Sequence, residues 1–215
     1  MDFLLVILTA YLLGSIPFGF LVSRLYGVKD IRLVGSGNIG MTNVWRTVGP
    51  SAALMVFIGD VGKGMLAVLL TPVISGGSLN LEYLKIIAGL TAVVGHIFSV
   101  FLKFRGGKGV NTALGVMTML LPSEILISAA IFIITVAASR FISLGSIISS
   151  LALFLIVLLE YLFWPGRIDS IYILVTFILW IVILFTHRSN IMRLLRGDEN
   201  RFSFRRKLPG GQLHG

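Results

Sequence analysis

The chain has 215 residues, of which 56% are hydrophobic and only 13% are charged. Soluble domains carry about a quarter charged residues, so this composition excludes an ordinary soluble domain and predicts an integral membrane protein. The net charge is +9, and the chain has no cysteine, which excludes disulfides, thiolate metal sites and an acyl-cysteine intermediate.

A helix needs about 20 apolar residues to cross roughly 30 Å of hydrocarbon. Apolar stretches of suitable length recur along the whole chain. The expected spans are residues 3–23, 51–72, 82–102, 110–121, 125–139, 141–162 and 170–186. The first is interpreted as a retained span and not as a signal peptide, because Asp2 and not a basic cluster precedes a long apolar run. Pro17 is expected to kink it.

Residues 110–139 allow two interpretations, because Pro122 interrupts them. One long helix gives six spans, whereas a hairpin with a short first arm gives seven. The hairpin places all but three of the 18 Lys and Arg residues on one side of the membrane, the exceptions being Lys63, Lys85 and Arg167. The positive-inside rule therefore predicts an all-α integral membrane protein with seven transmembrane helices, the N-terminus outside and the C-terminus cytoplasmic.

A glycine-rich stretch with the sequence F-L-K-F-R-G-G-K-G-V-N follows the third expected span. Glycine leaves room for consecutive backbone N–H groups to converge on one anion, and Lys108 adds positive charge. The stretch is therefore predicted to cradle a phosphate, although a tight turn between two spans is the simpler alternative. The predicted topology brings it to the same membrane face as further hydrogen-bond donors: Ser36, Asn38, Asn43, Arg46, His187, Arg188 and Asn190.

Asp60, Lys63 and His96 are ionisable residues that fall inside expected spans. Asp60 and Lys63 are three residues apart and share a helix face, so they form either a structural ion pair or part of the site. His96 is expected to hydrogen-bond between packed helices. Ser143, just after Arg140, is either a helix N-cap or a substrate contact.

Four segments carry a family resemblance: V-G-S-G-N-I-G-M-T-N-V-W-R, G-H-I-F-S-V-F-L-K-F-R-G-G-K-G-V, S-R-F-I-S-L-G-S-I and H-R-S-N-I-M-R-L-L-R-G-D-E. In this order they resemble the motifs of the bacterial acyl-phosphate:glycerol-3-phosphate acyltransferases, the PlsY family. The resemblance runs from the first span to about Glu199. It implies acyl transfer from a fatty acyl phosphate to the sn-1 hydroxyl of glycerol 3-phosphate, giving lysophosphatidic acid and phosphate in bacterial phospholipid synthesis.

The resemblance and the donor inventory together give the predicted site. The residues predicted to act in catalysis are Ser36, Arg46, Lys108, His187 and Asn190. The residues predicted to bind substrate are Gly35, Gly37, Asn38, Asn43, Lys63, Gly106, Gly107, Gly109 and Ser143. Asp60, His96 and Glu199 are predicted to be structural. No metal or cofactor is expected, and the general base is left open between His187 and a substrate phosphate.

We expect one transmembrane acyltransferase domain over residues 1–200 and a basic tail over residues 201–215, whose native origin is left open. The expected location is the bacterial inner membrane, with the site on the cytoplasmic face. Expected partners are acyl phosphate, glycerol 3-phosphate and membrane lipids, with no nucleic acid. A transporter of phosphate or a small organic anion is the alternative, but it needs anion-binding groups near the midplane. A non-catalytic lipid-binding scaffold is the second alternative.

Overall fold

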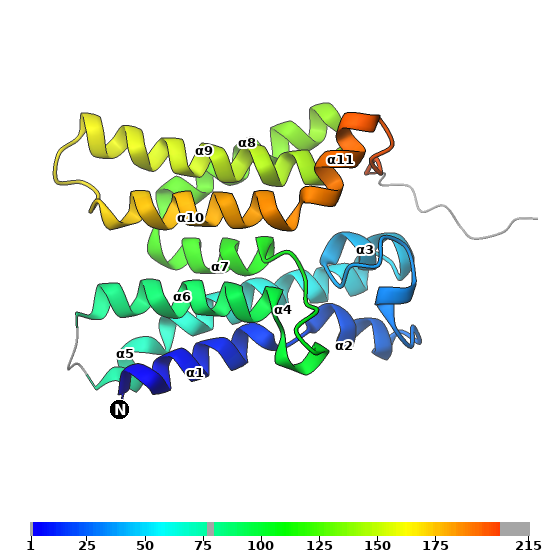
Figure 1. Cartoon of the computed structure of the whole chain (residues 1–215), viewed down its shortest axis with the longest axis horizontal. Helices are drawn as coiled ribbons and strands as arrows, with labels where there is room; N and C mark the ends of the chain where they lie inside the picture. The colour runs from blue at the N-terminus through cyan, green and yellow to red at the C-terminus, as the bar shows by residue number, and fades with distance from the viewer. Residues whose placement is uncertain (1, 77–79, 203–215) are drawn as a thin grey trace, which may run out of the picture.

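A computed structural model describes residues 2–76 and 80–202, and every regular element within them is helical (Figure 1). The elements are α1 (Asp2–Ser15), α2 (Phe18–Leu25), η1 (Ile31–Leu33), α3 (Met41–Thr47), α4 (Pro50–Leu69), α5 (Thr71–Ser75), α6 (Leu81–Ile97), η2 (Val100–Leu102), α7 (Val110–Leu120), α8 (Pro122–Ser139), α9 (Ile142–Phe163), α10 (Ile171–Thr186) and α11 (Arg188–Arg196). The predicted all-α class is confirmed. Residues 203–215 of the predicted basic tail lie outside the described residues.

The described helices include five that are long and apolar enough to cross a membrane. They are Phe3–Leu25, Pro50–Ser75, Leu81–Leu102, Pro122–Ser139 and Ile142–Phe163. A sixth results if α10 and α11, which meet at a 61° bend, count as one span, and α7 is a shorter apolar helix. The chain is therefore a multi-pass membrane protein.

The predicted kink in the first span is a complete break between α1 and α2. Pro17 has no N–H group, so it interrupts the helical hydrogen-bond ladder. The carbonyl groups at the break are satisfied by distant segments: the hydroxyl of Ser99, just after α6, donates to Ser15 O at 2.5 Å, and Lys63 Nζ of α4 donates to Ile16 O at 2.7 Å. The break therefore docks onto α4 and the end of α6.

The chain also breaks where Pro122 was expected to interrupt it. Leu121 leaves the helical region (φ −138°, ψ 65°), and Pro122 starts α8 in the first turn, where its missing N–H group does no harm. α7 and α8 are thus two helices that run back on one another (Figure 1), as the hairpin interpretation predicted. α7 packs closely on α4, because a Cβ on Gly64 would lie 2.3 Å from Thr112 O.

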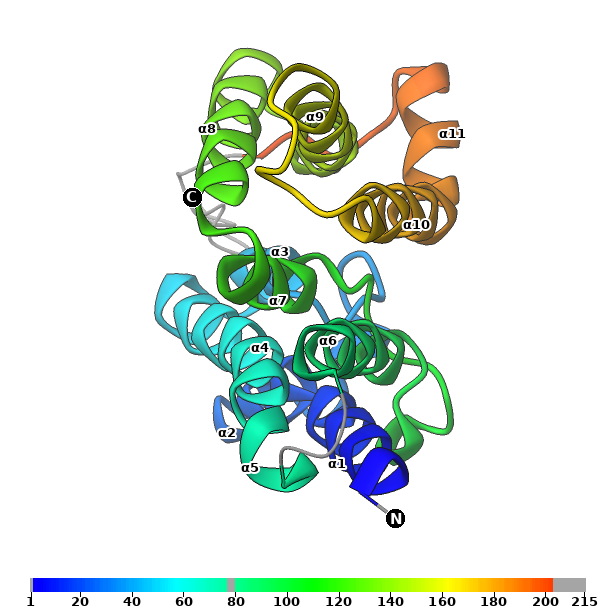
Figure 2. The ribbon, with the colours of Figure 1, turned by 90° about the vertical axis from the view of Figure 1, so that its left-hand side faces the viewer.

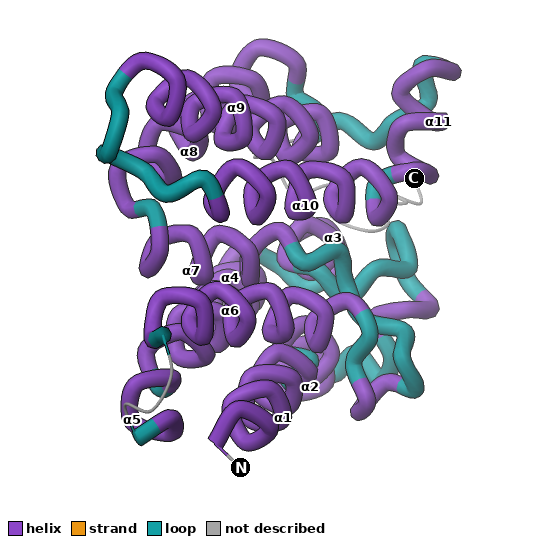
Figure 3. Tube along the Cα trace, turned by 60° about the vertical axis from the view of Figure 1, so that its left-hand side comes forward, coloured by secondary structure: helices purple, strands orange, loops and turns teal. Residues whose placement is uncertain are grey.

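Seen end-on, α8 to α11 form one layer, α1 to α6 form the other, and α7 lies between them (Figure 2). A shared apolar core joins the layers, with Ile86 and Val93 of α6, Met117 of α7, and Val175 and Leu179 of α10 among its members. The loops between α2 and α3 and between α6 and α7 lie at the end of the bundle that holds α2, α3 and α11 (Figure 3). A cavity enters the bundle from this end.

Candidate active site

The cavity has a volume of ≈ 540 Å³ and lies between α3, α7, α8, α9, α10 and the segment after His187. Its inner walls are largely apolar, with Leu114, Met117, Phe132 and Leu153 among the lining residues. All five residues predicted to act in catalysis line this same cavity: Ser36, Arg46, Lys108, His187 and Asn190. The structure therefore brings together side chains from three distant segments of the chain.

Glu199 anchors the polar end of the cavity. Its Oε1 accepts hydrogen bonds from Ser143 Oγ at 2.8 Å and from Asn190 Nδ2 at 2.7 Å, and its Oε2 accepts one from Arg193 Nε at 2.7 Å. Burial opposes ionisation of Glu199, but these bonds together lower its pKa. The Asn190 side chain also accepts a hydrogen bond from Lys108 Nζ. Glu199 thus holds Asn190, and Asn190 holds Lys108.

Positive charge dominates this end of the cavity. Arg46, Lys108 and Arg193 surround the carboxylate of Glu199. Burial lowers the pKa of Lys108 to about 8; Glu199 opposes the shift, while Arg193 and Arg46 add to it. Burial also lowers the pKa of Arg46, whose Nη2 donates to Asn200 O at 3.1 Å. The excess of cations makes this an anion-binding site.

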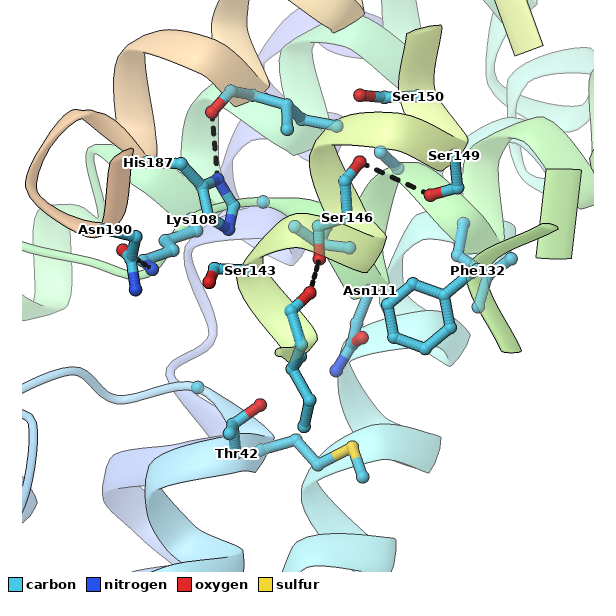
Figure 4. Close-up of a pocket in the computed structure, with 18 of the residues that line it drawn as sticks. Thr42, Lys108, Asn111, Phe132, Ser143, Ser146, Ser149, Ser150, His187 and Asn190 are labelled. Atoms are coloured by element: carbon cyan, nitrogen blue, oxygen red, sulfur yellow. Dashed lines mark hydrogen bonds between the residues drawn. The ribbon is translucent and has the colours of Figure 1, made fainter. Parts of the chain in front are cut away.

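His187 is neutral and has a defined tautomer. Its Nδ1 lies 2.9 Å from Ile183 O (Figure 4), and because a carbonyl only accepts, Nδ1 carries the proton and Nε2 does not. Burial and the charge of Lys108 lower the pKa of His187 to about 4. The residue can accept a hydrogen bond at Nε2, but it is a weak base.

The loop before α3 is organised by Asn43, which was predicted to bind substrate. Asn43 is 1% exposed. Its Oδ1 accepts the Ser36 N–H at 2.8 Å, and its Nδ2 bonds the carbonyls of Val34 and Asn38 at 3.0 and 2.8 Å. Asn43 also lines the cavity, so its contact with substrate stays a prediction, but its amide group is already used within the loop.

Gly35 and Gly37, which were also predicted to bind substrate, shape the same loop. Gly35 has φ +62°, and a Cβ on it would lie 2.2 Å from Asn43 Oδ1. Gly37 also has positive φ, and neither glycine lines the cavity, whereas Ser36 and Asn38 do. The glycines shape the loop so that their neighbours reach the cavity.

The predicted cradle at Gly106 and Gly107 is wrong in its atomic detail. The Gly106 N–H donates to Ile97 O at 2.9 Å and the Gly107 N–H to His96 O at 3.0 Å, so both groups satisfy the end of α6. A Cβ on Gly106 would lie 2.0 Å from His96 O. These glycines permit close approach of two backbones. Of this stretch, Lys108, Gly109, Val110 and Asn111 line the cavity.

Lys63 was also predicted to bind substrate, and its contacts lend this prediction no support. It is 3% exposed, does not line the cavity, and lies 2.8 Å from Asp60 Oδ1 while donating to the broken first span. Asp60 and Lys63 thus form the structural ion pair that was one of the two interpretations. His96 lies between them and α7, with Nδ1 3.5 Å from Asp60 Oδ1.

The site prediction missed a stripe of hydroxyl groups in the cavity wall. It consists of Ser128, Ser146, Ser149, Ser150 and Thr176, part of which is visible in Figure 4. Ser146, Ser149 and Ser150 of α9 donate to backbone carbonyls of their own helix, for example Ser150 to Ile147 O at 2.9 Å. Their recurrence every three to four residues was the available signal. Because these hydroxyls all donate to backbone carbonyls, the wall stays compatible with an acyl chain.

The fold and the cavity together define a class of protein: a multi-pass helical membrane protein whose site joins an anion-binding end to an apolar compartment. Such a site suits an amphiphilic anion. Within the described residues, no group of three or more His, Asp or Glu side chains is placed to hold a metal ion.

Residues 4–197 match the sequence model of the family described as glycerol-3-phosphate acyltransferase. The glycerol-3-phosphate acyltransferase of Desulforudis audaxviator is 43% identical over 94% of this chain and 97% of its own, and that of Trichlorobacter lovleyi is 45% identical over 90% and 94%. The solved structure of PlsY (YgiH), an integral membrane enzyme in its glycerol 3-phosphate form, has a TM-score of 0.82 and 38% identity over 94% of this chain and 96% of its own. The chain belongs to the glycerol-3-phosphate acyltransferase family. The resemblance seen in the motifs is confirmed, and the chain is an acyltransferase.

Proposed function

We propose that the protein transfers a fatty acyl group from acyl phosphate to the sn-1 hydroxyl of glycerol 3-phosphate, giving lysophosphatidic acid and phosphate. The observation that carries the proposal is the continuity between a cation-rich end and an apolar interior in one cavity. The PlsY structures, one in a glycerol 3-phosphate form and one in a lysophosphatidic acid form, support the acceptor and the product.

The acceptor phosphate is assigned to Lys108, Arg46 and the start of α7. Both cations line the cavity, and Gly109, Val110 and Asn111 bring the first turn of α7 to the same wall. A helix N-terminus carries unpaired N–H groups and a positive dipole end, which favour an anion. The anion-binding role predicted for the glycine-rich stretch is thereby moved from Gly106 and Gly107 to the residues that follow them.

The donor is activated before it reaches the enzyme, so no enzyme nucleophile is needed. The sn-1 hydroxyl oxygen bonds to the acyl carbon, the bond from that carbon to the phosphate oxygen breaks, and the phosphate leaves with the electron pair. Ser36 and the cations stabilise the charge that develops on the carbonyl oxygen and the leaving phosphate. The acyl chain lies along the apolar wall formed by α7, α8 and α9.

The proton of the attacking hydroxyl is assigned to a phosphate oxygen of the substrates. His187 lines the cavity, and its pKa of about 4 makes it a weak proton acceptor. We therefore assign His187 Nε2 to accepting a hydrogen bond that orients the hydroxyl group. The released phosphate then carries the proton away.

We further propose seven spans, formed by α1 with α2, α4 with α5, and each of α6 to α10. The N-terminus is outside, and the loops around the cavity face the cytoplasm of a bacterial inner membrane. The clustering of basic residues at the end that holds α2, α3 and α11 supports this orientation. Residues 1–200 form one domain in this proposal, and membrane lipids are its surroundings.

Orientation can be tested with single cysteines, because the chain has none of its own. Arg140→Cys follows α8, and its matched control Arg167→Cys follows α9. In intact cells a membrane-impermeant maleimide should label Arg167→Cys and spare Arg140→Cys until the membrane is opened. The reverse pattern would overturn the proposal, because it is expected from an inverted orientation or from six spans with the N-terminus outside. Equal labelling from outside would show that α9, which separates the two positions, does not cross the membrane.

The activity is tested with purified protein reconstituted in phospholipid vesicles. With acyl phosphate and glycerol 3-phosphate, we expect lysophosphatidic acid and phosphate in equal amounts. Neither substrate alone should give the product. Uptake of glycerol 3-phosphate without product formation would support a transporter, and binding without turnover would support a lipid-binding scaffold.

A further inference from the structure

A buried polar chain runs from α4 to the base of the loop that carries Lys108. Asp60 on α4, His96 on α6 and Thr112 on α7 are 2%, 4% and 0% exposed. His96 Nδ1 lies 3.5 Å from Asp60 Oδ1 and 3.1 Å from Thr112 Oγ1. One imidazole nitrogen therefore faces partners on two other helices, which fixes the ring plane.

The opposite edge of the same ring faces the loop. A Cβ on Gly107 would lie 2.3 Å from His96 Nε2, so the ring packs directly on Gly107. The backbone of His96 also accepts the Gly107 N–H at 3.0 Å. Lys108 is thus held on its N-terminal side by the end of α6 and on its C-terminal side by Thr112, four residues further on.

Lys108 needs this support because it stands between Gly107 and Gly109, and Gly109 has φ +83°. Glycine neighbours leave the backbone many conformations, so a long lysine side chain between them loses considerable entropy when it is fixed on a ligand. Groups that fix the backbone before binding reduce this cost.

We propose that Thr112 and His96, backed by Asp60, are positioning residues that preorganise Lys108 for the phosphate of glycerol 3-phosphate. The proposal rests on the proposed function. Nδ1 of the His96 ring lies beside Asp60 and Thr112, and the Nε2 edge of the ring packs against Gly107 where the residue borders the cavity. His96 therefore acts through the loop and not on the reacting atoms.

The test is Thr112→Val, which keeps the shape of the side chain and removes the hydroxyl. The KM for glycerol 3-phosphate should rise about tenfold with kcat changed less than twofold, as for a lost contact in a coupled polar network. The control is Thr118→Val on the same helix, where the hydroxyl bonds only Leu114 O, at 2.8 Å. Thr118→Val should leave KM unchanged, and Thr112→Ser should restore the low KM.

A double variant separates positioning from a general structural effect. Glycerol 3-phosphate binding is measured by calorimetry in wild type, Thr112→Val, Lys108→Met and the double variant. We expect Thr112→Val to weaken binding about tenfold when Lys108 is present and less than twofold when it is absent. An equal effect in both backgrounds, or a KM unchanged by Thr112→Val, would overturn the proposal. If the wild type makes no lysophosphatidic acid, the proposed function fails instead.

Discussion

Two buried carboxylates, Asp60 and Glu199, organise different parts of the molecule. Asp60 lies on α4 within a candidate span, with Lys63 Nζ at 2.8 Å, and Lys63 is also bonded to the broken first span. Glu199 lies after α11, beyond the spans, and accepts bonds from Ser143, Asn190 and Arg193. In the first cluster the charge of Lys63 is therefore used to hold the helices together.

The second cluster leaves its lysine available. Lys108 reaches Glu199 only through the amide of Asn190, so its charge is not neutralised by direct contact with a carboxylate. Arg46 adds a second cation to the same wall. A buried ion pair that is complete contributes to the structure, whereas an incomplete one with excess positive charge is ready to take an anion. We therefore expect variants of the first cluster to lower stability and variants of the second to lower activity.

The largest effect is expected from Asp60→Asn. The change keeps the side-chain shape but leaves the Lys63 charge buried without its carboxylate, which costs about 3–5 kcal/mol of unfolding free energy. Thermal denaturation in detergent should show a large fall in apparent Tm. Asp30→Asn is the control, since its partner Arg32 is partly exposed, and should shift Tm much less. Adding Lys63→Met to Asp60→Asn should recover part of the loss; equal Tm values for Asp60→Asn and Asp30→Asn would contradict the comparison.

Lys108→Met is expected to lower activity strongly and to leave stability almost unchanged. Loss of a preorganised cation at the developing charge should lower kcat/KM about 10²- to 10³-fold. Apparent Tm should change little, because methionine fills the space of the lysine stem and no buried carboxylate is left unpaired. Lys103→Met, in the same loop but exposed and away from the cavity, should keep wild-type kinetics. A Tm loss as large as that of Asp60→Asn would place Lys108 among the structural residues.

The pH dependence of kcat/KM tests whether the charge of Lys108 binds the substrate. Lys108 binds an anion only when protonated, and its pKa in the free protein is about 8. As pH rises through about 8, kcat/KM for glycerol 3-phosphate should fall, approaching about tenfold per pH unit. Lys108→Arg keeps its charge throughout this range, so its profile should be flat there. A wild-type profile without a fall by about pH 9.5 would show that Lys108 does not supply the charge.

The sequence was sufficient to predict the helices because charged residues, turn residues and prolines mark where they end. α9 runs over Ile142–Phe163, within one residue of the expected 141–162, since Arg140 and the Trp164–Gly166 turn bound its apolar run. Pro17 and Pro122 marked two breaks. The motifs also identified the five predicted catalytic residues that line the cavity. Each of these residues carries a hydrogen-bond donor and was predicted to lie at one membrane face.

The roles of individual groups could not be predicted in the same way. A glycine needed for close backbone contact, such as Gly107, has the same sequence signature as a glycine whose N–H binds phosphate. Likewise the amide of Asn43 is equally suited to substrate and to its own loop. Which carbonyl groups lie within reach depends on tertiary packing, and α6 supplies the partners of Gly106 and Gly107 only once the loop has folded back on it.

The smallest of the expected effects concerns Gly107, where the His96 ring beside Asp60 packs against the loop that carries Lys108. Gly107→Ala puts a Cβ 2.3 Å from His96 Nε2, so the ring that contacts Asp60 and the loop that carries Lys108 must move apart. Gly107 does not have positive φ, so the obstacle is steric. We expect a loss of about 1–3 kcal/mol of stability together with a higher KM for glycerol 3-phosphate.

Gly62→Ala is the matched control, because nothing lies within 4 Å of its added Cβ and it sits inside helix α4. It should raise stability by up to about 1 kcal/mol and leave KM unchanged. Purified variants are compared by apparent Tm and by KM in the same vesicles. If Gly107→Ala changed Tm but not KM, His96 would belong to the Asp60 cluster alone. A change in both quantities is expected only if the ring transmits the packing of α4 to the position of Lys108.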